Sequence, residues 1–183
     1  MCQFPWKPHS RSGSLIEDGD TSLILEPRDP EFESRVRSSF ARQEAMRTFG
    51  VTLERVAPGA VDMALPFRAD LTQQHGFLHA GVITAVVDSA CGYAALSLME
   101  PGTAVLSVEF KVQLLAPARG KRFRALGRVV RTGRTLTVVT GELRAYAQEP
   151  ARGTASGVVG EGELIALLNG TMMTVRDRQG LAD

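Results

Sequence analysis

Between residues 30 and 49, apolar positions recur every four residues: Phe32, Val36 and Phe40. This spacing puts them on one face of an α-helix. Pro30 suits the first helical position and Gly50 suits the residue after a helix end. The pattern predicts one amphipathic helix over residues 30–49. Before it, residues 1–29 contain Pro, Gly and Ser without periodicity, which predicts an irregular N-terminal extension.

The most apolar stretch of the chain runs from His79 to Leu98, contains no proline and stops before Pro101. Its helix-forming residues and its length predict a helix over residues 79–99, with about five turns. Apolar side chains occupy every side of this helix, so we expect other elements to surround it.

Most of the remaining chain has β-strand character, with a polar–apolar period of two that is clearest from Leu106 to Leu114. Six runs qualify as strands: Val51–Ala57, Ala60–Phe67, Leu106–Leu114, Arg122–Arg131, Thr135–Tyr146 and Leu164–Val175. An antiparallel sheet curled around one long helix buries that helix best. The sequence therefore predicts an α+β domain over residues 30–183, with five to six strands wrapped around a central helix.

Composition narrows the class of protein further. The chain has 183 residues, a formal net charge of +1 and two cysteines, Cys2 and Cys91. No apolar run reaches the ~18–20 residues of a membrane span, and the first ten residues lack the apolar core of a secretory signal. Two cysteines form no disulfide framework. These features argue against membrane, disulfide-rich secreted and disordered proteins, and we expect a cytoplasmic location.

One formal charge, Asp88, interrupts the central apolar stretch. Helical spacing places it on a stripe of small residues that reaches back to the helix start: Ala80, Thr84, Asp88, Cys91 and Ala95. Burial raises the pKa of a carboxylate unless a partner compensates. Two interpretations stay open, a structural acid paired with an arginine or exposed at an interface, and a catalytic carboxylate.

The start of the same helix favours the catalytic interpretation. Its first backbone N–H groups have no acceptor within the helix, so the amide of Ala80 or Gly81 can hold a carbonyl oxygen that gains negative charge. Gln73, in the preceding loop, offers a side-chain amide for the same oxygen. A carboxylate with such donors suits transfer of an acyl group to water.

Other reactive residues give weaker signals. His75 and His79 are four residues apart, but the glycine-containing loop between them and the lack of further ligands argue against a metal site. Cys91 is most simply a small buried apolar residue. We therefore expect no metal.

A basic segment follows the central helix. Residues 111–134 hold eight of the 21 basic residues and no acidic one. The segment is either a solvated strand face or an anion site. A phosphorylated ligand such as coenzyme A needs only two or three of these side chains. Nucleic acid is disfavoured, because only Phe123 supplies an interleaved aromatic ring.

A family resemblance appears once these residues are taken together. Gln73–Val82, followed by Asp88 and then Leu106–Glu109, resembles the hotdog-fold thioesterases of the phenylacetic-acid-degradation (PaaI-like) type. The likeness covers roughly residues 48–175. Its core is the family's histidine-glycine-glycine motif with an acid nine residues after the histidine. In this chain Ala80 replaces the first of those glycines.

The resemblance also implies roles for individual residues. Asp88 matches the acid that acts as general base or nucleophile on an acyl-CoA thioester. Ala80 stands where a backbone N–H holds the thioester oxygen, and Gln73 where a side chain helps to polarise that carbonyl. Ser107 matches a hydroxyl that positions water or the carboxylate. We expect further substrate contacts from five residues: Phe77, His79, Gly81, Arg131 and Arg134.

Three functions are compatible with these features. The first is an acyl-CoA thioesterase without cofactor, which the resemblance implies to be a homodimer or a dimer of dimers (a homotetramer), with Asp88 and Gln73 from opposite chains. The second is a hydratase or dehydratase on acyl thioesters, for which His79 is the candidate histidine. The third is a non-catalytic acyl-CoA-binding module. The intact set of Gln73, Asp88 and Ser107 argues against the non-catalytic module, and the lack of a His-Phe-Pro signature argues against the hydratase.

Overall fold

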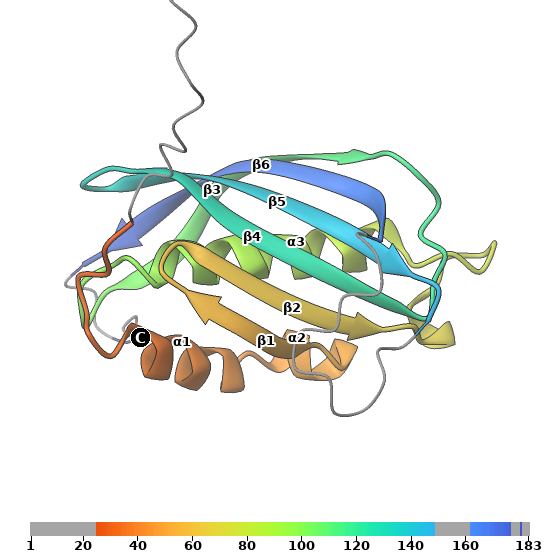
Figure 1. The fold of residues 1–183 in the computed structure, drawn as a ribbon, viewed down its shortest axis with the longest axis horizontal. Coiled ribbons are helices and arrows are strands. Elements are labelled where there is room, and N and C mark those ends of the chain that lie inside the picture. The colour runs from red at the N-terminus through yellow and green to blue at the C-terminus, as the bar shows by residue number, and fades with distance from the viewer. Residues whose placement is uncertain (1–24, 149–161, 177–179, 181–183) are drawn as a thin grey trace, which may run out of the picture.

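A computed structural model describes residues 25–148, 162–176 and 180 (Figure 1). Most of the extension predicted over residues 1–29 therefore lies outside the described residues. Six antiparallel strands form one sheet in the order β1-β2-β4-β5-β6-β3. Their bounds are Thr52–Ala57 (β1), Ala60–Pro66 (β2), Ala104–Leu114 (β3), Arg122–Thr132 (β4), Leu136–Tyr146 (β5) and Glu163–Val175 (β6).

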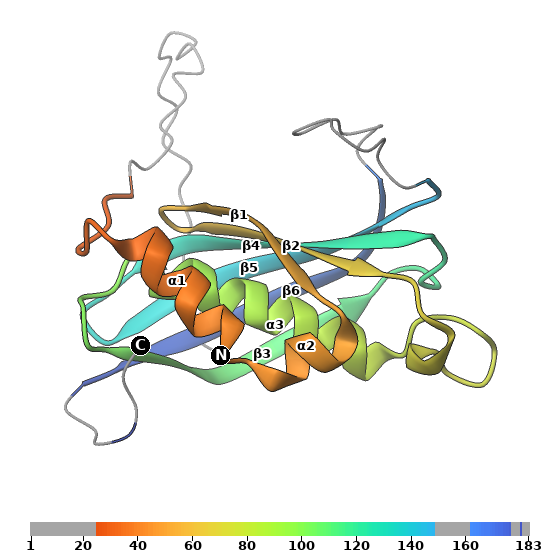
Figure 2. The same ribbon diagram turned by 90° about the horizontal axis from the view of Figure 1, so that it is seen from below.

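The central helix α3 (Ala80–Leu96) lies along the concave face of this sheet. Helices α1 (Phe32–Ala41) and α2 (Glu44–Phe49) lie on the same side of the sheet, next to α3 (Figure 2). Most residues of α3 are buried, as expected for a helix that is apolar on every side. A short 3₁₀ turn, Ala69–Leu71, precedes the loop that leads into it. The prediction of an α+β hotdog fold, with a sheet of five to six strands wrapped around one long helix, is confirmed.

Two glycines allow the helix to approach the sheet closely. Gly127 of β4 and Gly141 of β5 are direct partners in the antiparallel register. A Cβ atom on Gly127 would lie 2.3 Å from the backbone carbonyl of Ala90, and one on Gly141 would lie 2.5 Å from Val87 Cγ1. Side chains at this pair would therefore push α3 off the sheet.

We expect Gly127→Ala to lower the free energy of unfolding by about 1–3 kcal/mol, because the obstructing atoms are backbone and cannot rotate away. Gly92→Ala is the matched control: a Cβ there meets nothing within 4 Å, and alanine favours the helix by about 1 kcal/mol. Urea unfolding of both variants checks this. Equal stability of the two would contradict the close packing at Gly127.

The single helix predicted over residues 30–49 is wrong in one respect. The structure has two helices, α1 (Phe32–Ala41) and α2 (Glu44–Phe49), separated at Gln43, whose backbone is extended with φ −82° and ψ 91°. In one continuous helix, Met46 would point about 80° away from Val36. The break turns both side chains into the core, where their exposures are 2% and 0%.

Helix α1 also holds the C-terminal end of α3. The Arg35 guanidinium donates to the carbonyl oxygens of Leu96 (3.1 Å) and Met99 (2.7 Å), and it pairs with Asp29 at 3.2 Å. A cation is favoured at this end of a helix because the last carbonyls lack partners. This contact fixes helix α1 against the C-terminal end of α3.

Candidate active site

Asp88 lies in the middle of α3 and faces the edge strand β3. Its Oδ1 atom accepts a hydrogen bond of 2.7 Å from the Ser107 hydroxyl. The register of β3 against β6 shifts directly after Ser107, a β-bulge that changes which residues face the helix. The structure thus brings together two of the predicted site residues that are 19 positions apart in the sequence.

Burial dominates the electrostatics of this carboxyl group. Desolvation raises the pKa of Asp88 above its usual value, and the hydrogen bond from Ser107 acts in the opposite direction. Within the described part of the chain, Asp88 has no ion-pair partner. The alternative of a structural acid paired with an arginine is therefore disfavoured. A carboxylate with a raised pKa is a better proton acceptor near neutral pH.

A cavity of about 250 Å³ adjoins Asp88. Residues of α1, α3 and β3, together with the break before α2, form its lining: Ser39, Gln43, Asp88, Ser89, Gly92, Tyr93, Val105, Leu106 and Ser107. The carboxylate therefore has space for a bound group beside it.

At the start of α3, His79 is the N-cap residue, and its Nδ1 atom accepts a hydrogen bond of 2.9 Å from the amide of Gly81. Of the two amides expected to bind a carbonyl oxygen, that of Gly81 is therefore occupied. The amide of Ala80 has no acceptor among the described residues. In the described part of the chain, the backbone N–H of Ala80 therefore remains available to a substrate.

The loop before α3 is ordered by its own hydrogen bonds. The backbone N–H of Gln73 donates to the backbone carbonyl of Phe77 at 2.8 Å. The side-chain oxygen of Gln73 accepts a hydrogen bond from the backbone N–H of His75. The Arg119 guanidinium lies over the Phe77 ring, 4.6 Å from its centre. These residues form a second group, located at the helix start.

The two groups of predicted site residues are separated within one chain. Asp88 follows Ala80 by eight residues of α3, or about 12 Å along the helix axis. None of Gln73, Phe77, His79, Ala80 and Gly81 lines the cavity at Asp88.

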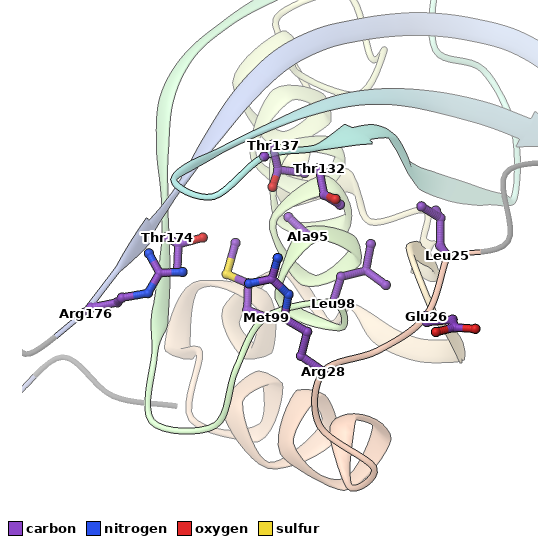
Figure 3. A pocket seen from close by; sticks show the side chains of 11 residues that line it. Leu25, Glu26, Arg28, Ala95, Leu98, Met99, Thr132, Thr137, Thr174 and Arg176 are labelled. Carbon is purple, nitrogen blue, oxygen red and sulfur yellow. The ribbon is translucent and has the colours of Figure 1, made fainter.

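Arg131 and Arg134 lie elsewhere, at the end of β4 and in the turn to β5. Arg176 donates to the carbonyl of Arg134 at 3.0 Å. The same turn borders a second cavity of about 150 Å³ at the C-terminal end of α3, whose lining includes Arg28 and Arg176 (Figure 3). Neither predicted arginine lines the cavity at Asp88, and their contact with substrate stays a prediction.

In residues 25–148, 162–176 and 180, no group of three or more His, Cys, Asp and Glu side chains is placed to hold a metal ion. In the same ranges, no helix is both long and apolar enough to span a lipid bilayer.

Of the nine residues that line the cavity, sequence reasoning named only Asp88 and Ser107, and the seven that it missed include Ser39, Gln43 and Tyr93. The apolar period of residues 30–49 predicts a helix, but no local signal shows which element it packs against. The Phe40 ring meets the Tyr93 ring edge-on, with centres 5.9 Å apart. A long-range contact of this kind brings the first helices to Asp88.

Comparisons with known proteins identify the family and the fold. A family model described as the thioesterase superfamily matches residues 75–150, which include the start of α3, Asp88 and Ser107. A protein of Saccharolobus solfataricus that is named as an esterase is 30% identical over 113 residues, covering 62% of this chain and 73% of the relative.

Solved structures extend the likeness. A thioesterase family protein from Silicibacter pomeroyi is 46% identical, with a TM-score of 0.72, over 80% of this chain and 99% of that one. The PaaI protein of Escherichia coli, from the phenylacetic acid degradation operon, shares the fold at 16% identity and a TM-score of 0.66, over 83% of this chain and 96% of that one. The chain belongs to the thioesterase superfamily of hotdog-fold thioester hydrolases.

Proposed function

We propose that the protein hydrolyses acyl-CoA thioesters to the free acid and CoA in the cytoplasm, with Asp88 as the general base or nucleophile and with no cofactor. The observation that carries this proposal is the half-buried Asp88 carboxylate, which has a hydrogen bond from Ser107 and an adjoining cavity but no ion-pair partner in the described chain. The single buried cysteine within the described residues, Cys91, is free, as suits a reducing compartment.

In the general-base route, Asp88 takes a proton from water while the oxygen of that water bonds to the thioester carbon. The carbonyl oxygen becomes an oxyanion, which the amide of Ala80 and the side chain of Gln73 stabilise. The carbon–sulfur bond then breaks, and the departing thiolate receives the proton from Asp88. In the nucleophilic route, a carboxylate oxygen of Asp88 bonds to the thioester carbon, and the carbon–sulfur bond breaks to release the thiolate and leave an anhydride. Water then hydrolyses the anhydride to the free acid and a protonated Asp88, which passes its proton to the thiolate and is restored as the carboxylate.

Both routes need a second copy of the chain. An oxyanion within about 3 Å of the Ala80 amide cannot belong to a carbonyl that reacts beside the Asp88 of the same helix, about 12 Å further along. Strand β3, which carries Ser107, is an edge strand with exposed apolar residues: Leu106, Val108, Phe110 and Leu114. An exposed apolar edge favours pairing with another strand. We therefore propose a homodimer through this edge, which puts one chain's Ala80 near the other chain's Asp88.

A screen for free thiol release tests the function. We expect the protein to release CoA from at least one of a set of short, medium, long and aryl CoA esters, because the site activates water next to a thioester. Crotonyl-CoA is the control for the hydratase alternative, since hydration adds water without releasing thiol. Binding of acyl-CoA without turnover of any ester would instead identify a non-catalytic module and contradict the proposal.

A further inference from the structure

The cavity beside Asp88 has both polar and apolar lining. The Asp88 carboxylate and the Ser107 hydroxyl form one hydrogen-bonded pair that lines it, and Gln43 and Ser89 form another. Gly92, Val105 and Leu106 supply apolar lining. An acyl group whose carbonyl lies at the carboxylate would therefore share the cavity with a second pair of polar side chains.

Gln43 is held in place by hydrogen bonds of its backbone and its side chain. Its backbone N–H donates to the backbone carbonyl of Phe40 at 3.0 Å, and its backbone carbonyl accepts from the backbone N–H of Met46 at 3.1 Å. Its side-chain Nε2 donates to the Ser89 hydroxyl at 3.2 Å. The extended backbone at the break between α1 and α2 therefore places the Gln43 side-chain amide against α3, next to Ser89.

The oxygen atom of the same side-chain amide lacks a hydrogen bond in the described part of the chain. The Oε1 atom of Gln43 is buried and has no hydrogen-bond donor among the described residues. A buried acceptor without a donor is unfavourable, and a ligand that supplies a donor removes the penalty. Rotation of the amide changes which atom faces Ser89 but still leaves one polar atom to be matched.

The size of the cavity limits what fits. A cavity of 150 Å³ is known to hold benzene, so by proportion a cavity of about 250 Å³ takes on the order of ten non-hydrogen atoms. This excludes a long saturated chain from lying wholly inside it.

We infer that Gln43, supported by Ser89, is a specificity-determining residue that selects short acyl groups carrying a hydrogen-bonding substituent, such as a hydroxyl, beyond the thioester. This inference rests on the proposed acyl-CoA hydrolysis at Asp88. The carboxamide matches the polar substituent, while the volume of the cavity within one chain favours short acyl groups.

The test compares hexanoyl-CoA with hydroxyhexanoyl-CoAs that carry the hydroxyl at successive carbons. For wild type, kcat/KM should be about tenfold higher for the best hydroxylated ester than for hexanoyl-CoA, as expected for one matched hydrogen bond. Gln43→Leu should reduce that ratio to about one, because leucine has a similar size and no polar atoms. Ser89→Ala should reduce the ratio by a smaller factor, because it removes only the support of the carboxamide.

Gln113→Leu is the matched control. Gln113 also has a buried Oε1 atom without a donor, but it does not line the cavity, so its replacement should leave the ratio unchanged. A purely structural role for Gln43 would lower kcat/KM for all esters equally. Hydrolysis without preference for any hydroxylated ester, or an unchanged ratio in Gln43→Leu, overturns this inference alone. Failure to hydrolyse any ester overturns the proposed function together with it.

Discussion

Asp88→Asn should lower kcat by on the order of 10²-fold or more while the fold stays intact, because the amide cannot accept the proton from water. The shape of the side chain and the hydrogen bond from Ser107 are both compatible with asparagine. Thiol release from the best CoA ester, measured for wild type and variant at equal folded concentration, checks this. Ser107→Ala is the comparison: it keeps the carboxylate and should cost less. A variant as active as wild type would mean that another group is the base.

The raised pKa of Asp88 gives this prediction a second readout. Because burial raises the pKa of the carboxyl group, the acid limb of the wild-type rate profile should lie above the ordinary value of 3.8, with activity lost as pH falls through the raised pKa. Ser107→Ala should move that limb further upward, because it removes the hydrogen bond that lowers the pKa. An acid limb of the wild-type rate profile that lies below pH 3.8 would contradict the argument that burial raises the pKa of Asp88.

The same pKa shift fixes the sign of the effect on stability. A carboxyl group whose pKa is raised by folding prefers the protonated state in the folded protein, so its ionisation destabilises the fold as pH rises. Asp88→Asn removes that penalty. Its free energy of unfolding should therefore equal or exceed that of wild type at neutral pH, and the difference should shrink below pH 3.8. Loss of activity without loss of stability separates a catalytic role from a structural one.

Much of the fold could be predicted because its signals are local. The two-residue period of β3 and the apolar residues on every side of α3 follow from the amino-acid order alone. The break at Gln43 could not be predicted in this way. It depends on Val36 and Met46 both reaching a core whose other side consists of distant strands.

The candidate site also has some features that the sequence predicts and others that depend on long-range packing. The positions of Asp88 and Ala80 on the helix follow from spacing, and their separation follows from the rise of the helix. The hydrogen bond of Gly81 to the His79 side chain depends on a side-chain rotation that spacing does not determine. The approach of Gln43 to Ser89 joins residues 46 positions apart and depends on how α1 packs. Sequence spacing therefore locates the candidate residues along α3 better than it locates the residues that line the cavity.

Ala80→Pro should lower kcat by about 10²–10³-fold, because it removes the one amide at the helix start that remains available to an oxyanion. The backbone tolerates proline there: Ala80 is the first helical residue, and His79 before it has φ −66° and ψ 137°, a conformation that precedes proline readily. Ala80→Gly keeps the N–H group and is the matched control. Thiol release and thermal unfolding of both variants separate loss of the donor from loss of structure.

Mixing two inactive chains tests whether one site uses both copies. When Ala80→Pro and Asp88→Asn chains are refolded together in equal amounts, half of the dimers should be mixed, and each mixed dimer should contain one complete site. Activity should then recover to about one quarter of wild type, as random pairing in a twofold dimer requires. If mixed dimers form and remain inactive, the amide and the carboxylate do not meet across the subunits. Because about 12 Å of helix separates the two groups within one chain, that result would also rule out Ala80 as the oxyanion donor for Asp88.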